Sequence, residues 1–103
     1  MNTDTTARIS YPYHVSNMHR ETVEMTFPDF PEVCAISYSG EVALALLAPK
    51  LFQIIQIRMD LGLVVPLPSA GNDRLDLPPD LARKLFHYWQ FRGEVSPGGG
   101  TVW

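Results

Sequence analysis

The side chains with the most reactive chemistry are a single cysteine, Cys34, and three histidines, His14, His19 and His87. A nucleophilic cysteine needs a base beside it, and His14 or His87 would have to fill that role. Cys34 falls in a run that predicts a buried strand, where a cysteine is more often a small apolar side chain than a nucleophile. The histidines show no metal-ligand spacing with one another or with Cys34. We therefore predict no catalytic residue, no metal site and no cofactor.

Two carboxylates, Asp29 and Glu32, lie in a short loop that Pro28 and Pro31 stiffen by fixing φ. Such a pair could hold a divalent ion for hydrolysis, could simply be solvated, or could complement a basic protein partner. A hydrolytic site needs further acids that converge from separate elements, and the other acids fall mostly on predicted loops or outward positions. We predict that the chain is not an enzyme. The predicted partner-binding residues are Glu24, Asp29, Phe30 and Glu32.

Basic side chains form one cluster, which lies in the C-terminal third of the chain. It comprises Arg74, Arg83, Lys84 and Arg92. This cluster could contact phosphate groups or could be a solvated helix face. The formal net charge of −3 argues against a broad nucleic-acid interface, which needs an excess of Lys and Arg, but it suits a basic protein partner.

The composition is that of a small globular protein. With 103 residues, 46% of them hydrophobic and 18% charged, the chain is long enough for one domain with a modest core. The single cysteine fits a reducing compartment, and the polar N-terminal residues contain no signal peptide. The most apolar run, residues 42–57, is interrupted by Pro49 and Lys50 and is too short to span a membrane. We expect a cytoplasmic protein that binds no membrane and no small-molecule substrate.

Apolar periodicity predicts an α+β fold. Alternation of apolar and polar residues predicts strands at 9–15, 22–27 and 33–38, with a turn at 16–20, and further strands at 63–67 and 74–77. Helices are predicted at 40–61 and 79–91. The expected architecture is a small, antiparallel-rich sheet in the order β-β-β-α-β with one covering helix, followed by a short strand and a helix at the C-terminal end.

The predicted helix at 40–61 is apolar almost all round. Ser39 is a plausible N-cap, Gly62 would end the helix, and Pro49 should kink it near residues 45–49. A helix that covers one face of a small sheet needs only one apolar stripe. The additional apolar residues indicate either a thick core or a surface that a partner or a second copy covers, and we predict a homo-oligomer, a dimer or a tetramer.

Several segments, taken in order, resemble the HicB antitoxin family over residues 9–92. They are Tyr11-Pro12, Phe27-Pro28-Asp29-Phe30-Pro31-Glu32, the helix with Ala43 and Leu51, Val65-Pro66-Leu67-Pro68-Ser69, and Asp76-Leu77-Pro78 with Ala82, Lys84-Leu85 and Tyr88. No single motif is specific, and the resemblance depends on the order and spacing of all of them.

The resemblance implies a toxin-binding module at residues 1–69, similar to a ribonuclease H fold that has lost its catalytic acids. The partner would be a HicA-like toxin, a small basic ribonuclease that cleaves mRNA and whose active site the module blocks. Residues 70–103 would then correspond to a linker, a short strand and a helix of an incomplete segment that dimerises and binds operator DNA. We expect that segment to lack a recognition helix, because residues 93–103 leave no room for one. The alternatives are a dimeric autorepressor and a residual metal-dependent ribonuclease.

Overall fold

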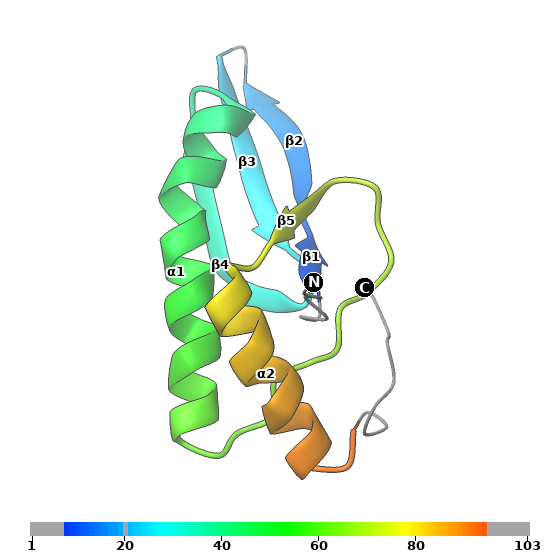
Figure 1. Ribbon diagram of the computed structural model, residues 1–103. Helices are drawn as coiled ribbons and strands as arrows, with labels where there is room; N and C mark the ends of the chain where they lie inside the picture. Colours follow the sequence, from blue (N-terminus) through cyan, green and yellow to red (C-terminus); the bar gives the residue numbers. More distant parts are fainter. Residues whose placement is uncertain (1–7, 20, 95–103) are drawn as a thin grey trace.

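The computed structural model describes residues 8–19 and 21–94 and confirms the α+β class. Its elements are β1 (Ser10–Pro12), β2 (His14–His19), β3 (Thr22–Phe27), β4 (Phe30–Ser37), α1 (Gly40–Asp60), β5 (Arg74–Asp76) and α2 (Pro79–Phe91). In Figure 1, α1 lies over the strands on one side of the molecule, and α2 lies beside it.

The strands form two antiparallel sheets rather than one. β2, β3 and β4 make a three-stranded sheet in that order, and β1 pairs with β5. The single strand predicted at 9–15 is therefore wrong, because the chain passes from one sheet to the other at Tyr13, whose N–H donates to the Asp73 carbonyl at 2.9 Å. Pro12 precedes this break and has no N–H with which to continue a ladder. The turn predicted at 16–20 is also wrong, since β2 continues to His19.

The stiff loop predicted around Asp29 is a tight turn between two paired strands. β3 ends at Phe27 and β4 begins at Phe30, so only Pro28 and Asp29 lie between them. The third strand starts three residues earlier than predicted and includes Pro31 and Glu32. Because β4 lies at the edge of its sheet, a proline near its beginning is tolerated.

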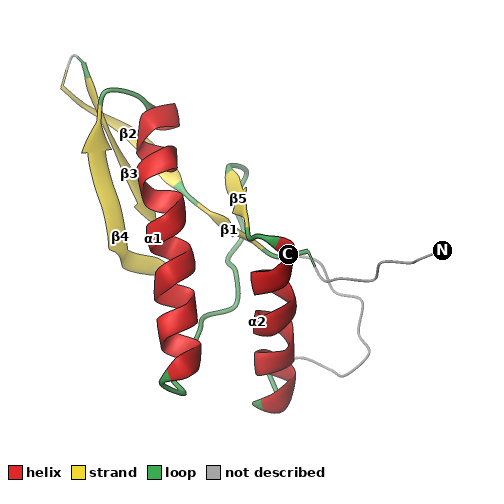
Figure 2. Cartoon of the chain, turned by 60° about the vertical axis from the view of Figure 1, so that its left-hand side comes forward, coloured by secondary structure: helices red, strands yellow, loops and turns green. Residues whose placement is uncertain are grey.

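Helix α1 begins where its cap was predicted. The Ser39 hydroxyl accepts from the Val42 N–H at 3.2 Å, and Gly62 adopts φ 71° beyond the other end. The helix continues through Pro49 as a single element. Residues at i, i+4 spacing form its buried stripe, which packs against β3 and β4 (Figure 2). The stripe consists of Ala43, Leu47, Leu51 and Ile55.

The length argument against a membrane span is wrong for α1. Among the described residues it is the one helix that is long and apolar enough to cross a membrane, with 21 residues and a mean hydropathy of 1.4. Length and composition alone do not distinguish a membrane span from the core helix of a globular protein. In this fold the stripe from Ala43 to Ile55 is fully buried, but only 22% of the most apolar 18-residue window of α1 is buried inside the molecule.

The strand predicted at 63–67 does not form. The chain there is extended but unpaired, and side chains from other elements donate to its carbonyl oxygens: Tyr88 Oη to Leu63 O (2.6 Å), Trp89 Nε1 to Val65 O (2.9 Å) and Tyr11 Oη to Pro66 O (2.6 Å). Pro66 and Pro68 have no N–H to contribute to a ladder. Arg58 Nη1 also donates to Val64 O at 3.3 Å, and these four bonds replace the pairing that a neighbouring strand would supply.

One hydrophobic core joins the regions before and after residue 69. Fully buried side chains from α2, Leu85 and Trp89, belong to the same cluster as Tyr11, Phe27 and Leu51. Helix α2 has the bounds predicted from the sequence, Pro79–Phe91, and Pro79 occupies its first turn. The core therefore holds α2 against the unpaired segment at 63–67 through Trp89.

Candidate functional site

The two carboxylates predicted to face a partner make contacts within the chain. Asp29 accepts hydrogen bonds from the Ser69 N–H at 2.9 Å and from the Ser69 hydroxyl. Glu32 forms a salt bridge with Arg58 at 2.6 Å. A hydrogen bond from its own backbone N–H, followed by the Arg58 guanidinium, lowers the pKa of Glu32 below its ordinary value. Both side chains thus fasten α1 and the segment before Ser69 to the start of β4.

Phe30, also predicted as a partner contact, is fully buried, so its ring cannot touch a partner in this conformation. The prediction for this residue is wrong because Phe30 opens a core strand instead of ending a loop. Its ring packs edge-to-face on Tyr11 with centroids 4.9 Å apart, and Arg58 lies 5.1 Å from its centroid. Glu24 is half-buried in β3, opposite Ser16 and Ile36 on the neighbouring strands.

The predicted burial of Cys34 is wrong. Cys34 is exposed rather than buried, because it points to the sheet face away from α1. It stands in a cross-strand row with Thr26 and then His14, so two strand spacings, about 9.5 Å, separate Cys34 from His14. Among the described residues, no hydrogen bond joins the Cys34 thiol to the His14 ring. Within residues 8–19 and 21–94, no three His, Cys, Asp or Glu side chains come together to hold a metal ion.

Three of the four basic residues considered for DNA contact are engaged within the chain. Arg74 donates to the Ser10 hydroxyl at 2.8 Å, the Ser10 carbonyl at 2.7 Å and the Ser69 carbonyl at 2.8 Å, which makes it a structural clamp. Arg83 pairs with Asp80. Arg92 pairs with Glu94, and the hydrogen bond with Glu94, followed by Tyr88, raises the pKa of Arg92. Lys84 is exposed on α2.

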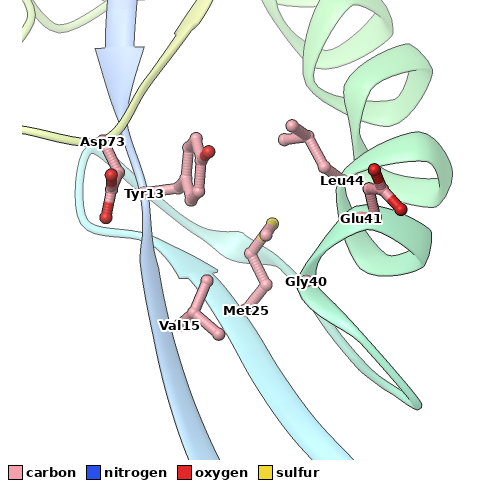
Figure 3. A pocket seen from close by; sticks show the side chains of 7 residues that line it. All are labelled: Tyr13, Val15, Met25, Gly40, Glu41, Leu44 and Asp73. Carbon is pink, nitrogen blue, oxygen red and sulfur yellow. The ribbon is translucent and has the colours of Figure 1, made fainter.

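A groove of about 290 Å³ opens between the start of α1, strand β2 and the loop before β5. Figure 3 shows Met25 between Tyr13 on one side and Leu44 on the other, with Asp73 beside Tyr13 and Glu41 beside Leu44. The remaining lining residues are Val15 and Gly40. The floor and walls are thus apolar and aromatic, and a carboxylate stands on either side.

The carboxylates beside this groove lack the hydrogen bonds and salt bridges that most other described carboxylates make. Glu32, Asp76, Asp80 and Glu94 each form a salt bridge. In the part of the chain that the structure describes, no hydrogen bond or ion pair engages the side-chain carboxylates of Glu21, Glu24, Glu41 and Asp73. Glu21 begins the return from the β2–β3 hairpin, and Glu41 lies in the first turn of α1. The hairpin and the start of α1 lie at the same end of the molecule (Figure 1).

An apolar groove with an anionic rim suits an amphipathic cation. The aliphatic stem of a lysine or arginine can pack on Met25 and Leu44 while its charged end meets Glu41 or Asp73. This arrangement could not be predicted from the sequence, because Asp73 was assigned to a linker and Glu41 to a helix end. Only the fold brings these two residues, 32 positions apart, to one groove. We refer to Tyr13, Glu41, Leu44 and Asp73 as the acidic groove.

No protein-family model and no curated protein sequence matches this chain.

Proposed function

We propose that this protein is an antitoxin-like binding protein that neutralises a small basic toxin by covering its active site. The observation that carries the proposal is the acidic groove, an apolar hollow whose two carboxylates have no partner in the described chain. The segment order that resembles the HicB family supports the same function, as does the net charge of −3. The proposed partner is a HicA-like ribonuclease that cleaves mRNA, which places the interaction in the cytoplasm.

Charge explains how such a protein would inhibit a ribonuclease. An enzyme that binds RNA without strong sequence preference needs a surface rich in Lys and Arg along the phosphate backbone. An acidic protein is attracted to the same surface, and its carboxylates compete with phosphate for the same cations. The unpaired Glu41 and Asp73 can pair with a cation without first breaking an internal salt bridge, which Glu32 would have to do.

The groove also supplies the apolar contact that a lasting complex needs. Rim charges chiefly accelerate association and set its salt dependence, whereas desolvated central contacts slow dissociation. Tyr13 and Leu44 are partly buried and pack against the core, so they form a firm surface on which a cationic side chain can lie. Glu21 adds a negative charge at the β2–β3 hairpin, whereas Glu24 lies on the sheet face away from the groove, since it precedes Met25 in β3.

The first experiment is co-expression with a candidate HicA-like toxin, to be sought in the reading frame next to the gene for this protein. We expect growth rescue and a complex on gel filtration, and the absence of both would refute the proposal. Calorimetry with a catalytically inactive toxin then tests the groove. Because two rim charges are lost, we expect the double variant E41Q/D73N to bind at least about tenfold more weakly, with a shallower salt dependence.

A matched control removes the same number of charges elsewhere. The double variant D60N/D80N also loses two carboxylates, but Asp60 bonds to Gln56 at the far end of α1 and Asp80 lies on α2. We expect this control to bind within about threefold of the wild-type protein, since distant exposed charges are screened at physiological salt. Equal weakening by both double variants would mean that only net charge matters and that the groove is not the contact surface.

A further inference from the structure

The outer edge of β4 is free in the described part of the chain. β4 is the last strand of the three-stranded sheet and pairs on one side only, with β3. It is eight residues long, and positions 33–38 carry no charged residue. Natural edge strands are usually protected by shortness, charge, proline or a covering element. Here Pro31 protects only the beginning of the strand, and the remaining edge presents unpaired backbone groups.

Exposed apolar side chains flank this edge on both faces of the sheet. On the face away from α1, which Ile36 shares with Cys34, Ile36 is 58% exposed, and Tyr38, just beyond the end of β4, is 82% exposed. On α1, Val42 and Leu46 are 46% and 52% exposed. Val42 and Leu46 lie one helical turn apart, and each is about 200° around α1 from Leu44, at 100° per residue. Leu44 lines the acidic groove, so Val42 and Leu46 occupy the flank of α1 that faces away from it. In Figure 2, β4 and α2 lie on opposite sides of α1.

We propose that a second copy of this chain docks on this side. β4 would pair antiparallel with β4 of the partner subunit about a two-fold axis near Ala35, giving one continuous six-stranded sheet. The flanks of the two α1 helices carrying Val42 and Leu46 would meet on the same face. This inference stands on β4 and α1 alone and does not depend on the proposed toxin.

The absence of charged residues along β4 favours a second copy of this chain over a basic partner as the occupant of this edge. In a two-fold interface each residue meets the same surface of the other subunit, so charged residues near the axis would face like charges. The run at 33–38 has no charge, and Glu32 beyond it is already neutralised by Arg58. β4 itself offers a basic protein no unpaired carboxylate, and the nearest, Glu24, lies one strand further in, on β3 opposite Ile36, whereas the acidic groove on the opposite flank offers two.

The available area suits a dimer that dissociates on dilution. Eight residues of strand span about 26 Å, and one helix layer on one sheet layer is about 20 Å deep. The contact is therefore on the order of 500 Å² per subunit, or about 1,000 Å² in total, which is near the lower limit for a specific interface. Pairing the free backbone groups of β4 adds hydrogen bonds with defined direction to this apolar area.

Light scattering and sedimentation of the whole chain over a concentration series test the proposal. We expect a concentration-dependent dimer, and Ile36→Lys or Val42→Lys should raise its dissociation constant at least about tenfold. Both side chains are exposed, so circular dichroism should show an unchanged fold. Phe91→Lys is the matched control, because Phe91 is 90% exposed at the end of α2, away from the edge of β4. It should leave the dimer intact.

Cys34 provides a direct measure of the strand pairing. With the axis near Ala35, Cys34 and Cys34 of the partner subunit are diagonal cross-strand neighbours about 7–8 Å apart. A thiol-specific cross-linker of that span should give a covalent dimer in the wild-type protein and none in Cys34→Ser. A mass of one chain up to about 1 mM would overturn the proposal. So would a dimer that neither Ile36→Lys nor Val42→Lys weakens, a Phe91→Lys variant that dissociates equally, or a dimer that Cys34 cannot cross-link.

Discussion

Removing one hydroxyl group, in Tyr11→Phe, tests how the unpaired segment at 63–67 is held in place. Tyr11 is fully buried, and its Oη donates to the Pro66 carbonyl at 2.6 Å. Burial, followed by the charge of Asp29, raises the pKa of the Tyr11 phenol far above its ordinary value, so the group remains a donor at any ordinary pH. The substitution keeps the ring and its edge-to-face contact with Phe30 and removes only the donor.

The loss in the free energy of unfolding depends on how far the Pro66 carbonyl, left without its donor, is buried. The Tyr11–Pro66 bond is partly buried, so its carbonyl loses its partner without full access to water, and we expect a loss of about 1–3 kcal/mol in the free energy of unfolding. Tyr88 makes a bond of the same length, 2.6 Å, to the Leu63 carbonyl, but that bond is exposed. Water can replace the lost donor there, so Tyr88→Phe should cost only about 0.5–1 kcal/mol.

Urea unfolding measures both variants on the same scale. The fluorescence of Trp89, which is fully buried, should report the transition, and the m-values should equal that of the wild-type protein. In thermal melts we expect the midpoint to fall by about 4–8 °C for each kcal/mol lost. A Tyr11→Phe midpoint equal to wild type, or a Tyr88→Phe cost at least as large as that of Tyr11→Phe, would refute the reasoning that carbonyl burial sets the cost.

Three further substitutions test other parts of the fold. The pKa of Glu32 is lower in the folded protein than in the unfolded chain, so its ionised form stabilises the fold above about pH 4.3. This stability is lost as the pH falls through the folded-state pKa. Glu32→Gln should therefore make the free energy of unfolding depend less on pH in the acid range. Pro49→Ala should raise the free energy of unfolding by up to about 3 kcal/mol, since it restores a helical hydrogen bond in α1. Gly71→Ala should lower the thermal midpoint, because its Cβ would lie 2.7 Å from Cβ of Pro12; an unchanged midpoint would contradict the close contact.

The helices could be predicted from the sequence because their ends are marked by single residues. Ser39 caps α1 through its own hydroxyl, and Pro79 occupies the first turn of α2. Gly62 adopts the left-handed conformation beyond α1, for which glycine is suited. Each of these effects acts within about one helical turn, so it is visible in the sequence without knowledge of the rest of the fold.

The strands were harder to predict, because the alternation of apolar and polar residues does not show which segment a strand pairs with. Residues 9–15 alternate without interruption, yet they belong to two sheets, since β5 is the partner of β1 and β3 is the partner of β2. Residues 63–67 are extended and Val65 is buried, but the partners are side-chain donors such as Trp89 instead of a strand. A ladder and a set of side-chain donors satisfy the same carbonyls, and apolar alternation looks the same in both cases.

The internal contacts of the predicted partner-binding residues could not be predicted from the sequence for a related reason. The turn is two residues long, and Asp29 and Glu32 are close enough to Ser69 and Arg58 to bond with them, although Glu32 stays exposed. Phe30 follows the turn directly and enters the core. The carboxylates without internal partners, Glu41 among them, could be recognised only once every nearby donor had been placed by the fold.

Helix α1 links the two proposed surfaces, and its apolar composition follows from serving both. A thick core would require its extra apolar residues to be buried, but burial is complete only along the stripe from Ala43 to Ile55. Leu44 forms a wall of the acidic groove, and Val42 and Leu46, on the opposite flank, remain about half exposed. Because these flanks are about 200° apart around one rigid helix, a second copy on the β4 side leaves the groove of each subunit open. A dimer could therefore bind two basic partners at once, with no competition between the two interfaces.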